Sequence, residues 1–173
     1  MSTREWNWPL LVVDDEDFIL DLLKRQLKDE GYHILSASSG ESALQLLKTH
    51  QVGVIVSDQS MPGMDGITFL HQVRQIDEEV VLIMLTGNGT LGNALEAINA
   101  LKIFSYILKP WSAPVLRSTI RNAFQYYEMT SIYRVTLKRT FQSNEHLNKK
   151  NEKLIEYIKE LEIKLGILQG MRS

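Results

Sequence analysis

The stretch Val54-Ile55-Val56-Ser57-Asp58-Gln59-Ser60-Met61-Pro62-Gly63-Met64-Asp65-Gly66 changes character sharply at its first acid. A run of mostly β-branched apolar residues stops at Asp58, a turn rich in proline and glycine follows, and a helical pattern then begins. This order predicts that Asp58 ends a buried strand, which is where open α/β sheets bind their ligands. A lone acid at such a position is more often a turn or capping residue, by about two to one. The other acids of the chain argue against that ordinary role.

The composition narrows the class of protein. The chain has 173 residues, a net charge of −2 and 44% hydrophobic residues, which suits one domain with a full core plus an appendage. The absence of cysteine excludes disulfides, zinc–thiolate sites and thiol nucleophiles. The near-neutral charge gives no general argument for nucleic acid as a direct partner. The apolar run Leu10–Val13 is too short for a signal peptide or a membrane span, so we expect a cytoplasmic protein without membrane insertion.

Five strands alternate with five helices along the chain. Apolar runs predict strands at Leu10–Val13, Tyr32–Ala37, Val52–Ser57, Val80–Leu85 and Ile103–Leu108. Helical patterns follow them, beginning at an expected Asp17 cap, at Ser39, near Ile67, at Asn88 (weakly, to Leu101) and near Ala113, with Gly31 closing the first. This alternation predicts an α/β, flavodoxin-like, doubly wound five-stranded parallel sheet in the order 2-1-3-4-5, with a long C-terminal coiled-coil helix.

Polar residues follow the apolar runs at four predicted strand ends. They are Asp14 and Asp15 after the first strand, Asp58 after the third, Thr86 after the fourth and Lys109 after the fifth. Three carboxylates in one crevice repel one another unless a cation binds, and an all-oxygen set suits Mg²⁺. A carboxylate there can attack phosphorus while a lysine holds the phosphoryl oxygens. Each residue alone could be a cap, a turn residue or a solvated cation, but together they favour phosphoryl transfer by about nine to one.

Residues 8–128 resemble the receiver domain of two-component response regulators. The resemblance rests on Asp14-Asp15, the block from Asp58 to Gly66, Thr86-Gly87 and Lys109-Pro110. It implies that Asp58 is the phospho-acceptor and that Mg²⁺ is the cofactor, held by Asp14 (mostly through water), Asp15, Asp58 and the backbone carbonyl of Ser60. It also implies that Thr86 and Lys109 contact the phosphoryl group and that Thr86 and Tyr106 form a switch.

The resemblance implies a phosphorylation-dependent response regulator that takes a phosphoryl group from a histidine kinase or phosphotransfer protein onto Asp58. It would act on a downstream protein target and would not be an enzyme beyond self-catalysed phosphoryl transfer and dephosphorylation. Lys102-Ile103 stand where receivers often carry Gly-Ala, so the loop before the fifth strand is expected to differ.

Trp111 after Lys109-Pro110 resembles receivers attached to enhancer-binding ATPases or cyclic-di-GMP phosphodiesterases. Nothing in these 173 residues resembles a Walker loop, a metal-binding His-Asp pair or a helix-turn-helix. The alternative to a self-contained regulator is therefore the N-terminal regulatory part of a larger response regulator whose effector is absent from this sequence.

A heptad pattern marks the last quarter of the chain. Its d positions carry Leu147, Leu154, Leu161 and Leu168, and its a positions carry Asn151, Ile158 and Leu165. Upstream, the same frame places Tyr133 and Thr140 at d with Leu137 and Asn144 at a, a weaker seam. The narrow stripe favours a two-stranded coiled coil over a helix packing on its own domain, by about four to one. Residues 129–170 are thus predicted to form a homodimer, with Asn151 favouring parallel chains in register.

Overall fold

The computed structural model describes residues 6–87 and 101–170. The helix predicted from Asn88 to Leu101 lies outside these residues except at its last position. The contacts within the chain divide it into two compact units, Met1–Met129 and Thr130–Ser173, and each unit is described by itself. The boundary predicted after residue 128 stays a prediction.

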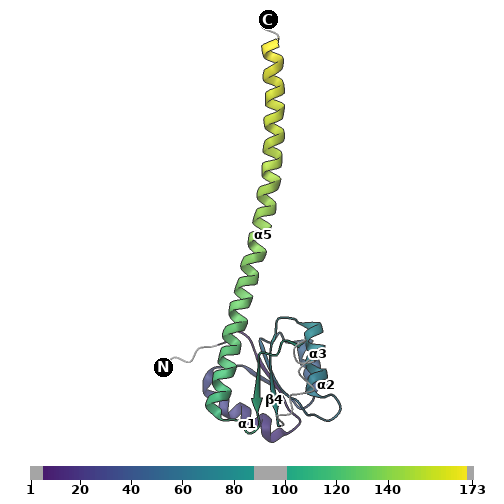
Figure 1. Cartoon of the computed structure of the whole chain (residues 1–173), viewed down its shortest axis with the longest axis vertical. Coiled ribbons are helices and arrows are strands. Elements are labelled where there is room, and N and C mark those ends of the chain that lie inside the picture. The colour runs from purple at the N-terminus through teal and green to yellow at the C-terminus, as the bar shows by residue number, and fades with distance from the viewer. Residues whose placement is uncertain (1–5, 88–100, 171–173) are drawn as a thin grey trace. The chain divides into compact units, whose positions relative to one another are not determined.

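The first unit is built on a parallel sheet of five strands (Figure 1). The strands are β1 (Leu10–Val13), β2 (Ile34–Ala37), β3 (Val54–Asp58), β4 (Val81–Thr86) and β5 (Ser105–Leu108). Their order is β2-β1-β3-β4-β5, which confirms the predicted topology. Every residue of β1, β3 and β4 is buried, because helices cover both faces of the central strands. The carboxyl ends of β1 and β3 therefore lie next to each other.

The helices are α1 (Asp17–Leu27), α2 (Gly40–Leu47), α3 (Gly66–Ile76) and α5 (Ala113–Gly170), with a 3₁₀ turn η1 (Lys28–Glu30) after α1. Ser39 caps α2 as predicted, because its side-chain oxygen accepts the Ser42 backbone N–H at 3.2 Å. Gly31 ends the first helical segment with a φ of 77°, a conformation that favours glycine.

The expected cap of α1 was wrong by one residue. Asp17 is the first residue of α1, and the N-cap position belongs to Glu16, which makes no side-chain capping bond. The physical reason lies in Asp14, whose carboxylate Oδ1 accepts the Glu16 backbone N–H at 3.0 Å. This bond holds the chain just before the helix, so that α1 begins beside the functional edge of the sheet.

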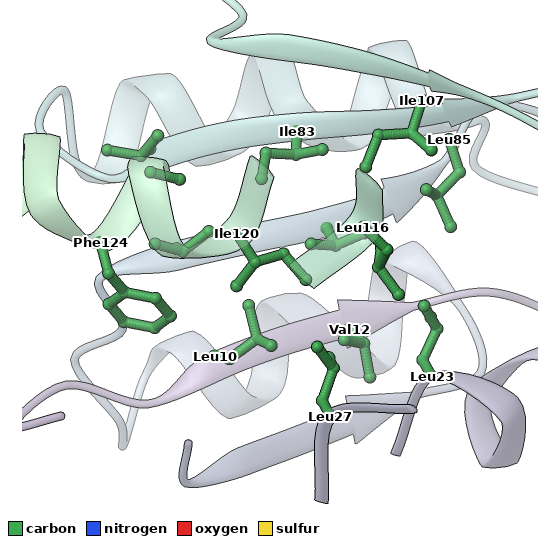
Figure 2. Packing of buried hydrophobic residues seen from close by; sticks show 14 of the residues in the cluster. Leu10, Val12, Leu23, Leu27, Ile83, Leu85, Ile107, Leu116, Ile120 and Phe124 are labelled. Atoms are coloured by element: carbon green, nitrogen blue, oxygen red, sulfur yellow. The ribbon is translucent and has the colours of Figure 1, made fainter. Parts of the chain in front are cut away.

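Two hydrophobic cores lie on opposite faces of the sheet because alternate residues of each strand point to opposite sides. One core joins Leu10 and Val12 of β1 to α1 and the first turns of α5, with Leu23, Leu27, Leu116, Ile120 and Phe124 (Figure 2). The other joins Leu11 and Val13 to the helix that follows β3, with Phe69, Leu70 and Val73. This two-sided burial is what a doubly wound sheet requires.

An aromatic group fastens the chain before β1 to the buried turns of α5. The ring of Trp6 lies 5.7 Å from that of Tyr32 and 5.0 Å from that of Phe124, measured between centroids. The rings of Trp8 and Tyr127 form a T-shaped pair with their centroids 5.5 Å apart. The two N-terminal tryptophans are therefore part of the packing of the first unit.

The second unit consists of the continuation of α5. Every described side chain from Val135 to Lys164 is exposed, including those of the predicted heptad seam. The long C-terminal helix is confirmed, whereas its pairing with another helix stays a prediction. Among the helices of the described part of the chain, none is both long enough and apolar enough to cross a membrane.

Candidate functional site

The predicted site residues meet at the carboxyl edge of the sheet. Asp14 follows β1, Asp58 ends β3, Thr86 ends β4 and Lys109 follows β5. Asp14, Asp58 and Thr86 are buried, which is unusual for two acids unless they are paired. The pairing partner of both acids is the same lysine.

Lys109 bridges the two buried carboxylates. Its Nζ lies 2.9 Å from Asp14 Oδ2 and 2.7 Å from Asp58 Oδ1. Burial disfavours the ammonium form, but the hydrogen bonds and charges of Asp58 and Asp14 outweigh burial and raise the pKa of Lys109. The backbone N–H of Lys109 also donates to the Thr86 carbonyl at 2.8 Å, which fixes the start of the loop. The site therefore holds one permanent positive charge between two carboxylates.

The second oxygen of each carboxylate is held by a loop amide. The Ser60 backbone N–H donates to Asp58 Oδ2 at 2.7 Å, and the Glu16 N–H donates to Asp14 Oδ1. Burial raises the pKa of Asp14, although the hydrogen bonds from Lys109 and Glu16 oppose that rise. Each carboxylate is thus held through both of its oxygens, and oriented groups of this kind favour catalysis by positioning.

Contacts within the loop from Asp58 to Gly66 account for several of the residue types found there. The Gly66 N–H donates to the Gln59 carbonyl at 2.9 Å, and a Cβ atom at Gly66 would collide with the Asp58 carbonyl oxygen. Gly63 has a φ of 76°, and Asp65 caps α3 by accepting the Thr68 N–H at 2.7 Å. The motif is a turn that returns the chain to the Asp58 backbone and then begins a helix.

The residues present fit Mg²⁺ by their chemistry. The acids at this edge offer oxygen ligands only, and Mg²⁺ keeps several waters while binding one or two carboxylates. Asp15 and Ser60 are exposed beside the two buried acids. Within residues 6–87 and 101–170, no three His, Cys, Asp or Glu side chains converge as a ready-made metal cluster.

Thr86 and Tyr106 lie on the same face of neighbouring strands. The register of β4 and β5 pairs Met84 with Tyr106 and Thr86 with Leu108. Tyr106 packs against the core on the α3 side, and burial raises the pKa of its phenol. Its hydroxyl is buried and has no hydrogen-bond partner among the described residues. The two residues of the predicted switch are therefore near neighbours on one surface of the sheet.

The loop before β5 contains Lys102 in an unusual backbone conformation. Lys102 adopts a φ of 50°, a conformation typical of glycine, at the position where the family resemblance implies glycine. Arg74 of α3 supports this loop, because its guanidinium donates to the Leu101 carbonyl at 2.9 Å and to the Val80 carbonyl at 2.8 Å. The sequence analysis did not single out Arg74, since its acceptors are backbone carbonyls that no side-chain pattern marks.

The chain belongs to the response regulator receiver family. Residues 10–121 match the model of the response regulator receiver domain, which is a phospho-acceptor domain of two-component systems. A crystal structure of a response regulator receiver domain protein from Clostridium thermocellum superposes with a TM-score of 0.65 at 32% identity. The superposition covers 71% of this chain and 98% of that one.

Curated relatives are longer proteins. The hydrogenase transcriptional regulatory protein HoxA of Cupriavidus necator is 40% identical over 116 residues, which cover 67% of this chain and 24% of HoxA. The transcriptional regulatory protein YvrH of Bacillus subtilis is 34% identical over 140 residues, covering 80% of this chain and 53% of YvrH. The chain therefore spans about a quarter to a half of the length of these relatives.

Proposed function

We propose that this chain is a phosphorylation-dependent response regulator and that Asp58 accepts its phosphoryl group. The observation that carries the proposal is the Lys109 ammonium bound to both Asp14 and Asp58 at the carboxyl edge of the sheet. In this arrangement the Asp58 carboxylate can act as the nucleophile, and the Lys109 ammonium supplies a cation for the phosphoryl oxygens.

Phosphorylation of Asp58 exchanges one bond to phosphorus for another. An oxygen of Asp58 forms a bond to phosphorus while the bond to the donor breaks, and the donor atom leaves with its electron pair. Asp14, Asp15, Asp58 and the Ser60 carbonyl would hold Mg²⁺, which when bound neutralises charge on the phosphoryl oxygens. Lys109 would exchange its bond to Asp58 Oδ1 for one to a phosphoryl oxygen, while the Ser60 N–H keeps the Asp58 carboxylate oriented.

The switch would begin at Thr86. A phosphoryl oxygen on Asp58 offers a new acceptor to the Thr86 hydroxyl, and the space that Thr86 leaves can take the Tyr106 ring. The support is that both residues share one face of the β4–β5 pair and that the Tyr106 hydroxyl has no partner among the described residues. This arrangement is a two-state element biased by a local charge.

The donor would be a histidine kinase or a phosphotransfer protein, and the chain would work in the cytoplasm on a downstream protein. Beyond its own phosphorylation and dephosphorylation we assign it no enzymatic activity. Because HoxA extends well beyond the matched part, a second candidate function is the regulatory part of a longer regulator with its own effector. In that case α5 would connect the receiver to the effector.

The second unit would form a parallel homodimer through its heptad seam. Leu147, Leu154 and Leu161 are 52%, 58% and 39% exposed in the single chain. Burying each leucine in a paired helix stabilises the dimer by roughly 1.5–3 kcal/mol before ordering is counted. A helix that leaves this seam in water has an apolar surface without a partner, which is the support for pairing.

Phosphorylation by acetyl phosphate tests the assignment of Asp58. With Mg²⁺, intact-mass spectrometry should find one added phosphoryl group that is released by base. Asp58→Asn should gain none, whereas Asp21→Asn, which alters an exposed acid of α1, should be labelled like the unaltered chain. A labelled Asp58→Asn chain, or full labelling in excess chelator, would contradict the proposal.

A further inference from the structure

The first turns of the second unit carry apolar side chains where a coiled coil is normally polar. In the heptad frame of the seam, Ile132 and Arg139 occupy c positions and Val135 an f position, on the side away from the seam. We name Ile132, Val135 and Arg139 the outer face. Ile132 is 67% exposed and Val135 is 52% exposed. Neither side chain would be covered by pairing along the seam.

The same positions further along α5 are different. The c and f positions from residue 146 to 160 carry His146, Lys149, Lys153, Glu156 and Glu160, with an apolar residue returning only at Ile163. These polar side chains are what a solvated outer surface of a coiled coil requires. The apolar outer face is therefore a local feature of the start of the second unit and does not come from the helix as a whole.

The charges change at the same place. Between Thr130 and Asn144 the chain carries Arg134, Lys138 and Arg139 and no acid. Between Glu145 and Lys164 it carries five lysines and five glutamates, so the charge there is balanced. The basic segment is thus suited to a surface of opposite charge.

We propose that the outer face is a docking site for an acidic segment of a partner protein, with apolar side chains at its centre and carboxylates around them. Ile132 and Val135 would bury against the apolar part, and Lys138 and Arg139 would pair with the carboxylates. The term outer rests on the proposed coiled-coil dimer, whereas the apolar and basic residues do not depend on it.

The mixture of side chains favours a protein over a membrane or a nucleic acid. Arg139 follows Val135 by four residues and Ile132 by seven, so the charge and the apolar groups share one face. A helix that lies on a lipid surface separates these groups onto two faces. A phosphate backbone makes no use of Ile132 and Val135, which are the most unusual residues of the face.

Fluorescence anisotropy with designed peptides tests the site on the full chain. The probe is a labelled helical peptide of about 16 residues with leucines along one face and glutamates elsewhere, beside a counterpart with lysines in place of the glutamates. The glutamate peptide should bind and the lysine peptide should not. Ile132→Ser with Val135→Ser, and separately Lys138→Glu with Arg139→Glu, should each weaken binding about tenfold or more. Lys149→Glu with Lys153→Glu is the matched control and should change binding less than about twofold.

Several results would overturn the proposal. They are no binding of the glutamate peptide at about 1 mM, equal binding to all variants, or binding of anionic phosphatidylserine vesicles that is lost in the same variants. Light scattering tests a third possible occupant, which is a second copy of this chain. A change in oligomeric mass on Ile132→Ser with Val135→Ser would show that a second copy covers the face. Failure of the dimer itself would appear as a monomeric unaltered chain, and failure of Asp58 phosphorylation would leave all these measurements unaffected.

Discussion

The loop from Asp58 to Gly66 and the second unit place charged and apolar side chains in opposite ways. The first buries charge: Asp58 lies inside the molecule because Lys109 and the Ser60 amide satisfy its oxygens. The second exposes apolar side chains such as Leu154 along its helix. In the loop, Asp58, Asp65 and Gly66 each have a particular neighbour that accounts for them, whereas in the helix the apolar side chains follow a repeat. Substitutions should therefore act site by site in the loop and layer by layer in the helix.

Gly66→Ala should have the largest effect on the folded state, because its Cβ would collide with the Asp58 backbone carbonyl. Neither backbone can move without disturbing β3, so we expect a loss of about 2–4 kcal/mol in the free energy of unfolding. Urea denaturation measures this loss. Gly87→Ala is the control, since no atom of the described residues, apart from its chain neighbours, lies within 4 Å of its added Cβ, and it should change stability little. Equal losses of stability in both variants would contradict the predicted collision at Gly66.

Leu154→Asp combined with Leu161→Asp should convert the proposed dimer into a monomer. Each substitution removes roughly 1.5–3 kcal/mol of burial per chain and puts a charge into the seam. Light scattering should show a dimer for the unaltered chain and a monomer for the variant. The first unit should keep its melting temperature, because these side chains contribute nothing to its core. Lys153→Gln with Glu156→Gln, away from the seam, should remain dimeric. A monomeric unaltered chain at tens of micromolar would refute pairing along the seam.

Asp14→Asn should raise the melting temperature at pH 7 in chelator, by about 3 °C. Burial raises the pKa of Asp14 above its ordinary value of 3.8, so in the range above 3.8 the folded chain binds more protons than the unfolded chain. The stability contributed by this group therefore falls as pH rises through that range, and its ionised form opposes folding at pH 7.

The pH profile of the Asp14 variant checks the sign. The advantage of Asp14→Asn over the unaltered chain should shrink as pH falls and should vanish below 3.8, where Asp14 is protonated in the folded and the unfolded chain alike. Asp21→Asn, at an exposed position on α1, should show no such trend. A variant that is less stable than the unaltered chain at pH 7 would mean that the bond to Lys109 outweighs burial.

Lys102→Gly should have the smallest effect and should stabilise the chain. A left-handed conformation is unfavourable for a residue with a Cβ, and relief of that cost exceeds the added flexibility of glycine by about 0.5–1 kcal/mol. Thermal unfolding should show a higher melting temperature for Lys102→Gly and a lower one for the matched control Lys48→Gly, since Lys48 has ordinary helical angles. A destabilised Lys102→Gly chain would indicate that the Lys102 side chain contributes to the loop.

Much of the site could be predicted because its signals are local. Asp14, Asp58, Thr86 and Lys109 each follow an apolar run, and parallel strands bring their carboxyl ends to one edge. The predicted helix cap at Asp17 was wrong because the Asp14 carboxylate accepts the Glu16 backbone N–H just before the helix. Sequence periodicity does not reveal that hydrogen bond. Arg74 was missed because it binds main-chain carbonyls, which no side-chain pattern in the sequence marks.

By itself the sequence determined the strands, the acidic strand ends and the heptad repeat, because these depend on neighbours one to seven residues apart. The strand order followed from the usual topology of chains in which strands and helices alternate. Only the tertiary structure decided that Lys109 binds Asp14 and Asp58 together, since Lys109 and Asp14 are 95 positions apart in the chain. It also decided that Gly66 has no room for a side chain and that Lys102 takes a glycine-like conformation beside Arg74. Contacts of this kind depend on how far each side chain reaches once the sheet has formed, and a one-dimensional pattern does not contain those distances.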